Sequence, residues 1–244
     1  MPPTDVSADT ARVPGPTPGT GISQGSGTDA EDTLDLRLPE EFIALRVEAD
    51  AADRDDLLDR VGEWGRIRTP AGAFHLVPVR CERDLPLISG WMNDPAVAEF
   101  WELAGPRTLT EDHLRAQLTG DGRSVPCLGV LDGTPMSYWE IYRADLDPLA
   151  RHYPARPHDT GIHLLIGDVA DRGRGLGGTL LRAVADLVLD KRPACARVVA
   201  EPDLRNTRSV AAFLSAGFRF SAEVDLPAKR AALMVRDRSV RDLL

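Results

Sequence analysis

Residues 159–178, DTGIHLLIGDVADRGRGLGG, combine two features that could do chemistry. His163 lies inside a short apolar run, and an imidazole can take a proton from an attacking nucleophile near neutral pH. A loop of arginines and glycines, 172–178, follows that run and precedes an apolar helical pattern. Glycines allow close backbone approach, and the first turn of a helix points free N–H groups outward. The stretch therefore predicts an anion cradle with a candidate base beside it.

The elements that position these residues follow from hydrophobic spacing. Helical patterns cover 82–94, 110–118, 177–191 and 206–217, with Thr110 and Asn206 as N-caps. Strand patterns cover 73–79, 160–167, 196–202 and two runs after residue 217, and Asp132–Gly133 predicts the turn of a hairpin within 124–144. This order predicts an α/β (α+β) fold with a mixed central sheet and flanking helices.

Three regions differ in composition. Residues 1–33 are rich in Pro, Gly, Ser and Thr without hydrophobic periodicity, which predicts a disordered tail. Residues 34–70 form an N-terminal extension with a strand and a short helix pattern, and 71–244 form the main domain. The extension could add an edge strand, cover the acceptor side of the site or contact a partner.

Charge and composition narrow the function classes. The net charge of −9 argues against nucleic-acid binding, which needs excess Lys and Arg. No apolar run is long enough for a membrane span, and no secretory signal pattern opens the chain, so a cytoplasmic protein is expected. Cys81, Cys127 and Cys195 are few and far apart, which predicts reduced thiols and no metal site.

Two motifs at a matching separation, RGRGLG (172–177) and NTRSVAAFLSAGF (206–218), resemble those of the GNAT superfamily of N-acetyltransferases. The resemblance covers about 73–238 and implies that acetyl-CoA or another acyl-CoA lies where the strands GIHLLIG and ARVVAEP splay apart. Phe213 stands where many members have the tyrosine that protonates the leaving thiolate. The implied acyl-CoA contacts are Leu165, Ile166, Arg172, Arg174, Gly175, Gly177, Gly178, Asn206 and Phe213.

Further segments, among them 91–105, 138–153 and VVAEPDLRNTRSV (198–210), resemble the siderophore-biosynthesis acyltransferases of that superfamily. This implies acylation of a small amine or N-hydroxylated amine in hydroxamate siderophore biosynthesis. His163 and Asp203 match the positions assigned to the active site of that group. The acceptor wall is expected from Trp91, Phe100, Trp101, Tyr138, Trp139 and Glu140.

Alternatives remain open at this stage. An aminoglycoside 6′-N-acetyltransferase shares the scaffold, although the pattern G-[IV]-D is expected there in place of GIH, and a non-catalytic CoA-binding sensor would keep the fold. His163 could be structural, Asp203 could cap the helix near Asn206, and the aromatic residues could be plain core. His113 has no evident partner. The acyl chain, the acceptor skeleton and the choice between monomer and homodimer are also open.

Overall fold

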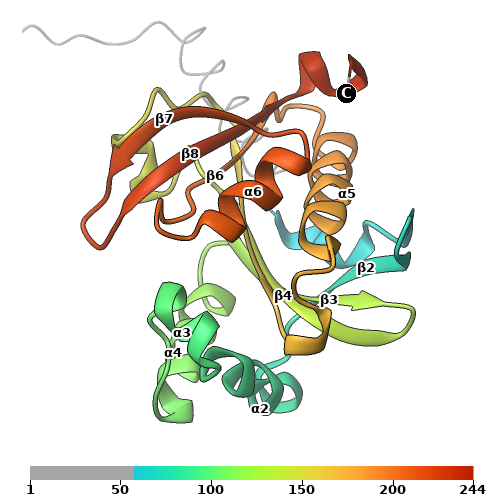
Figure 1. Ribbon diagram of the computed structural model, residues 1–244, viewed down its shortest axis with the longest axis vertical. Helices are drawn as coiled ribbons and strands as arrows, with labels where there is room; N and C mark the ends of the chain where they lie inside the picture. Colours follow the sequence, from blue (N-terminus) through green and yellow to red (C-terminus); the bar gives the residue numbers. More distant parts are fainter. Residues whose placement is uncertain (1–57, 244) are drawn as a thin grey trace, which may run out of the picture. The chain divides into compact units, whose positions relative to one another are not determined.

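A mixed sheet of eight strands organises residues 58–243, the part of the chain that the computed structural model describes (Figure 1). The strand order is β1-β2-β3-β4-β5-β6-β8-β7, in which β5 and β6 pair in parallel and the other neighbours are antiparallel. The strands are β1 (Ile67–Thr69), β2 (Gly72–Pro78), β3 (Ser124–Leu131), β4 (Thr134–Arg143), β5 (Thr160–Ile166), β6 (Arg197–Ala200), β7 (Arg219–Asp225) and β8 (Arg230–Asp237). The expected mixed sheet is confirmed.

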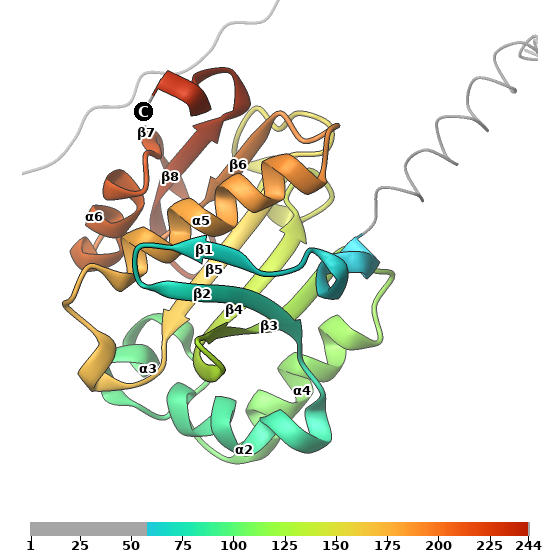
Figure 2. The same ribbon diagram turned by 90° about the vertical axis from the view of Figure 1, so that its right-hand side faces the viewer.

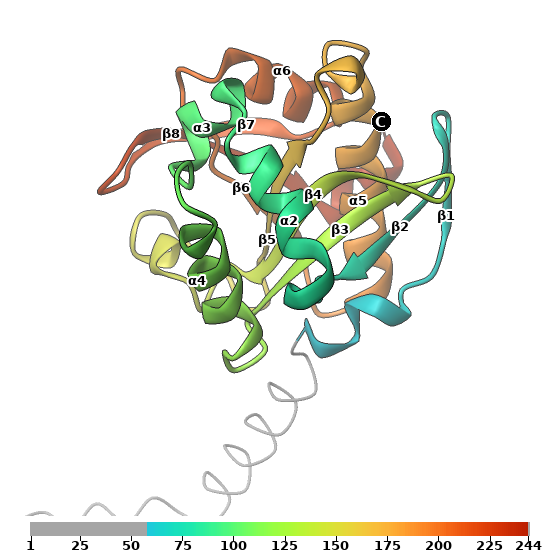
Figure 3. The same ribbon diagram turned by 90° about the horizontal axis from the view of Figure 1, so that it is seen from below.

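Helices cover both faces of this sheet. The helices are α2 (Cys81–Met92), α3 (Pro95–Trp101), α4 (Arg107–Leu118), α5 (Leu176–Lys191) and α6 (Thr207–Ser215), with short 3-10 helices η1 (Leu58–Glu63), η2 (Pro148–Arg151), η3 (Val169–Asp171) and η4 (Arg238–Leu243). Helix α5 lies across one face (Figure 2), and α2 and α4 cover the other face near β3 and β4 (Figure 3). None of the helices described is long and apolar enough to cross a membrane.

Side chains of β4 alternate between the two faces of the sheet and enter different buried clusters. Trp139 and Ile141 of β4 join the main core with Val184 of α5. Tyr138, from the same strand, packs in the second core with Leu114 of α4 and Met92 of α2. After the register shift between Gly129 and Val130, from Ser137 onward, the parity of a β4 residue decides on which face of the sheet its side chain lies.

The local predictions hold where the signals are strong. The hairpin turn is formed by Asp132 and Gly133, both with positive φ, as a two-residue turn with matching strand twist requires. Asn206 caps α6 by accepting the Ser209 N–H at 3.1 Å. Helix α4 is an exception because it begins at Arg107, and Thr110 is buried in its first turn and makes no cap.

Helix α3 was not predicted, although its start signal stands in the sequence. The Asp94 carboxylate accepts the Ala96 N–H at 3.0 Å, and Pro95 lies in the first turn of the helix. The N–H that proline lacks would have no intrahelical partner there, so the proline costs no hydrogen bond. The expected helix over 82–94 ends at Met92, and a new helix begins after Asp94. The proline marks a stop and a restart.

The N-terminal predictions for 1–57, including the tail and the expected strand, lie outside the described residues. Within 58–70, Leu58, Val61 and Trp64 enter the main core, and β1 pairs with β2 at the sheet edge. Of the three roles expected for the extension, residues 67–69 fill the first, because they form an edge strand of the sheet. The expected boundary at residue 70 lies inside the β1–β2 turn, and the domain division stays a prediction.

Parallel pairing of β5 with β6 is short. It joins Thr160 to Val198 and Gly161 to Val199, after which β5 continues to Ile166 beside β4 alone. The two strands therefore separate from Ile162 onward, as the resemblance implied. At the point of separation Gly161 lies opposite Tyr142, whose ring occupies the space of the missing β-carbon.

We expect Gly161→Ala to destabilise the protein by about 1–3 kcal/mol, the usual cost of overpacking. A β-carbon there would lie 2.0–2.4 Å from ring carbons of Tyr142, which is only 5% exposed. Gly90→Ala in α2 is the matched control, because nothing lies within 4 Å of its β-carbon position. That change should raise stability by up to about 1 kcal/mol. Denaturant unfolding of both variants measures this, and equal stability of Gly161→Ala and wild type would contradict it.

Candidate active site

His163 lies between two carboxylates at the point where β5 and β6 part. Glu140 of β4 is its direct cross-strand partner, and Glu140 Oε2 lies 2.9 Å from His163 Nδ1. Glu201 follows the last residue of β6, and its Oε1 lies 2.5 Å from His163 Nε2. The β4–β5 register supplies one contact and the strand separation supplies the other.

Each carboxylate is held by further donors. Glu140 Oε1 accepts from Tyr138 Oη at 2.9 Å and Gln117 Nε2 at 2.8 Å, and it lies 2.5 Å from His113 Nε2. Glu201 Oε2 accepts from Tyr142 Oη at 2.7 Å. Both carboxylates are only 8% exposed, so these donors replace the water that burial removes. The expectation that His113 has no partner is wrong.

Aromatic rings frame the imidazole. The Trp101 ring from α3 meets His163 edge to face at 6.0 Å and Tyr138 at 5.5 Å. Tyr142 lies at 4.9 Å from His163 with a tilted ring. The His163 side chain nevertheless remains 32% exposed, so a small molecule can reach it. The arrangement is an open-sided pocket wall with an ionisable group at its centre.

Electrostatics favour the charged form of this ring. Burial lowers the pKa of His163, but the Glu201 charge and hydrogen bonds to Glu140 and Glu201 outweigh it and raise the pKa to about 10. Burial opposes ionisation of Glu201, yet the imidazolium lowers its pKa to about 2. The pKa of Glu140 lies well below its usual range because hydrogen bonds from His113 and His163 outweigh its burial. His163 is therefore an imidazolium in the protein without acceptor, whereas its sequence suggested a neutral base.

A protonated ring that donates from both nitrogens must lose a proton before it can take one. Glu140 connects His163 Nδ1 to His113 Nε2 through contacts of 2.9 and 2.5 Å. His113 is 32% exposed, so this short chain of polar groups leads from the buried carboxylate to solvent. The three side chains provide a route for proton release.

The glycine loop has the geometry of an anion cradle. Gly173 and Gly175 have φ of 74° and 78°, and a β-carbon on either would meet nothing within 4 Å. These two glycines allow the left-handed backbone conformation, and the space next to the loop backbone is open. Gly175 is the N-cap of α5 without a side-chain cap, so the first N–H groups of α5 lack an intrahelical partner. This fits the pyrophosphate of an acyl-CoA.

The arginines and glycines of this loop divide into different roles. Arg174 is 68% exposed, and its ion pair with Asp171 is loose, with a distance of 3.8 Å. Its guanidinium is therefore accessible to an anion. The Arg172 guanidinium donates to the carbonyls of Ile166 and Gly167 and pairs with Asp94 at 2.7 Å, so its contact with acyl-CoA stays a prediction. It fastens the end of β5 to the start of α3.

Gly177 and Gly178 face α6. A β-carbon on Gly178 would lie 2.1 Å from Ser215 Oγ, so this glycine allows close helix packing, while Gly177 has ordinary contact distance to Ala212. Phe213 is 4% exposed and packs against Phe218 at 5.1 Å, which makes it a core residue that carries no proton donor.

Three expected acyl-CoA contacts have structural partners of their own. Leu165 is buried opposite Tyr138, the Ile166 carbonyl is bound by Arg172, and Asn206 caps α6. Contact of these residues with acyl-CoA stays a prediction.

The expected acceptor wall is assembled in part. Trp101, Tyr138 and Glu140 gather around His163. Trp139 is wrong as a wall residue because it faces the opposite core, where it contacts Phe74 and donates to Ser137 Oγ. The two remaining aromatics lie elsewhere: Trp91 is buried against Gly167, and Phe100 is half-buried on α3.

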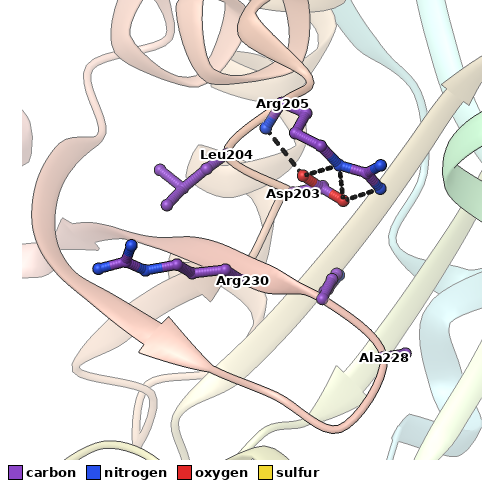
Figure 4. A pocket seen from close by; sticks show the side chains of 6 residues that line it. Asp203, Leu204, Arg205, Ala228 and Arg230 are labelled. Atoms are coloured by element: carbon purple, nitrogen blue, oxygen red, sulfur yellow. Dashed lines mark hydrogen bonds and ion pairs between the residues drawn. The ribbon is translucent and has the colours of Figure 1, made fainter.

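Asp203 does not pair with His163 in the described structure. Its carboxylate accepts the Arg205 N–H at 2.8 Å and holds the Arg205 guanidinium at 2.7 Å (Figure 4). Glu201, two residues earlier, occupies the position expected for Asp203. The sequence reasoning also missed further residues that contact the two carboxylates, namely His113, Gln117, Tyr142 and Lys229.

We expect the stability difference between wild type and His163→Gln to shrink as pH rises from about 6.5 to about 10. The raised pKa means that the folded state holds a proton which the unfolded state has released, so stability is full below about 6.5 and falls toward 10. The difference in the free energy of unfolding between the two proteins should fall by at most about 1 kcal/mol per pH unit, because water screens the partly exposed ring. Denaturant unfolding across this range measures it, and a constant difference would contradict the charged ring.

Comparisons with known proteins agree with this geometry. The family described as Acetyltransferase (GNAT) domain matches residues 80–226. Lysine N-acyltransferase MbtK of Mycolicibacterium paratuberculosis is 37% identical over 195 residues, which are 78% of this chain and 86% of that protein. The N(6)-hydroxylysine O-acetyltransferase of Escherichia coli is 37% identical over 155 residues, or 64% of this chain and 49% of its own length.

Solved structures show the same fold. An uncharacterized protein from Bacillus halodurans superposes with a TM-score of 0.69 at 32% identity, covering 73% of this chain and 92% of its own. AAC(6′)-Ib in complex with paromomycin and acetyl-CoA gives a TM-score of 0.61 at 25% identity, covering 69% and 96%. The family match spans more than half of the chain and includes both the separated strands and the glycine loop. The chain is therefore an N-acyltransferase that belongs to the GNAT acetyltransferase family.

Proposed function

We propose that this protein transfers an acyl group from acyl-CoA to the side-chain amine or N-hydroxyamine of a lysine- or ornithine-type acceptor in hydroxamate siderophore biosynthesis. The observation that carries the proposal is His163, held between Glu140 and Glu201 where β5 and β6 part. Relatives are named for lysine, N(6)-hydroxylysine and hydroxyornithine as acceptors, which supports a basic amino-acid side chain.

Acyl-CoA supplies the activated acyl carbonyl. Its pyrophosphate would be held by the N–H groups that open α5 after Gly175 and by the exposed Arg174. A structural relative has been solved with acetyl-CoA, which supports the same cosubstrate here.

The acceptor nitrogen would meet two carboxylates, Glu140 and Glu201, that flank the His163 imidazolium, with Lys229 3.7 Å from Glu201. Positive charge develops on the nitrogen as it attacks the carbonyl, and Glu140 and Glu201 stabilise that charge. The positively charged acceptor nitrogen competes with His163 for Glu201 and thereby lowers the pKa of His163. The His163 proton then leaves through Glu140 and His113, and the neutral ring can accept the proton that the acceptor nitrogen loses. An N-hydroxyamine is less basic than an alkylamine and arrives largely unprotonated.

An aminoglycoside acceptor is the competing candidate because of the similarity to AAC(6′)-Ib. Such polycations need an acidic cleft. Here the only carboxylate among the described residues that lines the hollow near Glu201 is Asp203, which Arg205 already holds, and Lys229 adds a positive charge, so the hollow does not offer the acidic cleft that they need.

Release of free CoA thiol tests the function directly. Acetyl-CoA and longer acyl-CoAs are crossed with L-lysine, N6-hydroxylysine, N5-hydroxyornithine, N-hydroxycadaverine and an aminoglycoside. We expect turnover with the amino-acid acceptors. Turnover with the aminoglycoside alone would refute the siderophore assignment, and acyl-CoA binding without thiol release for any acceptor would indicate a sensor.

His163→Gln should reduce kcat by about 100-fold or more while the KM for acyl-CoA changes little, because the ring handles the acceptor's proton and does not form the cradle. His152→Gln is the matched control, since His152 is an exposed histidine at the end of η2. Steady-state kinetics of the two variants decide it. A wild-type rate for His163→Gln would assign this histidine a purely structural role.

A further inference from the structure

We propose that a hollow beside Glu201 is a subsite for a carboxylate carried by the acceptor. This inference rests on the proposed function and specifies its substrate class. The hollow has a volume of about 450 Å³ and lies between the turn that follows β6 and the β7–β8 turn (Figure 4). It is lined by Asp203, Leu204, Arg205, Ala228, Lys229 and Arg230.

The hollow adjoins the reacting site through one side chain. Lys229 Nζ lies 3.7 Å from Glu201 Oε1, the same oxygen that contacts His163 Nε2 at 2.5 Å. None of its lining residues belongs to the glycine loop at 172–178. A molecule with its nitrogen at His163 can therefore place a second group in this hollow without approaching the acyl-CoA cradle.

Two of the three cations around the hollow are already neutralised. Arg205 holds Asp203, and the guanidinium of Arg230 pairs with Glu223 and with Asp225 on β7. Acidic groups of α3, Glu99 and Glu102, also act on Arg205. These two arginines therefore add little net charge to the hollow.

Lys229 is the least committed cation. Its ion-pair partner among the described residues, Glu201, is beyond hydrogen-bond distance at 3.7 Å. The Glu201 oxygens are also taken by closer donors, His163 and Tyr142. The Lys229 side chain is 27% exposed, so it can turn to a ligand. One available ammonium matches one negative charge.

A carboxylate fits this arrangement better than a phosphate, which carries more charge and calls for several unpaired cations. Arg205 uses Nε and Nη2 on Asp203, and its guanidinium, 70% exposed, can offer a further N–H. The acceptor is then a molecule with a nucleophilic nitrogen at one end and a carboxylate at the other. An α-amino acid has both groups, whereas a diamine lacks the second.

The test compares two acceptors that differ only by the carboxylate, N6-hydroxylysine and N-hydroxycadaverine, in wild type and Lys229→Gln. We expect wild type to favour hydroxylysine in kcat/KM by about tenfold or more, the ratio that one charged hydrogen bond supports. Lys229→Gln should lower the preference for hydroxylysine over hydroxycadaverine in kcat/KM about tenfold, because any effect of Lys229 through Glu201 falls on both acceptors and cancels in this ratio. Lys229→Arg should keep the preference. Arg219→Gln, an exposed charge on β7 outside the hollow, is the control and should match wild type.

The outcomes separate the subsite from the function. Equal kcat/KM for both acceptors in wild type would overturn the subsite and leave the acyltransferase assignment intact. An equal loss for both acceptors in Lys229→Gln would also overturn it, because Lys229 would then act through Glu201. Succinyl-CoA and acetyl-CoA are compared in parallel, and an effect tied to succinyl-CoA would place the carboxylate on the acyl group instead. If none of the acceptors is acylated, the proposed function itself is refuted.

Discussion

Parallel pairing between β5 and β6 ends after two residue pairs, and the arrangement of the active site follows from that separation. Glu201 directly follows the last residue of β6, and its carboxylate meets the His163 ring just beyond the last parallel pair. The separation also leaves the far end of β5 with β4 as its only strand neighbour, directly before the loop that opens α5. The same interruption of the sheet thus lies beside the imidazole and directly before the glycine loop.

The active site buries two carboxylates, Glu140 and Glu201, which is unfavourable in itself. The imidazolium of His163 between them offsets this unfavourable burial. Removing water from an ionised carboxylate costs several kcal/mol unless charge and hydrogen bonds replace it. Here each oxygen of Glu140 and Glu201 has a donor, from His163, His113, Gln117 or a tyrosine hydroxyl. The same contacts that hold the carboxylates ionised also hold the imidazole charged, so stability and proton handling are properties of one network.

The sequence predicted the parts of the molecule whose signals are local. Periodicity indicated the strands and helices around His163, and the motif pair indicated the separated strands. Long-range register was not accessible: that Glu140 lies opposite His163 depends on how β4 pairs with β5, and Trp139 was misplaced because its parity on β4 was unknown. Glu201 and Asp203 both follow the same strand, and the exact end of β6 decides which of them meets the ring. The sequence pattern also gave no sign that the Arg172 side chain binds two backbone carbonyls at the end of β5.

The Arg172 guanidinium contacts three points, the carbonyls of Ile166 and Gly167 at the end of β5 and the Asp94 carboxylate at the start of α3. The first two precede the glycine loop 172–178, and the third begins the helix that carries Trp101 to His163. One side chain therefore holds the end of β5 in place relative to the helix that carries Trp101. The glycine loop and the aromatic ring beside His163 thus share one anchor, the Arg172 side chain.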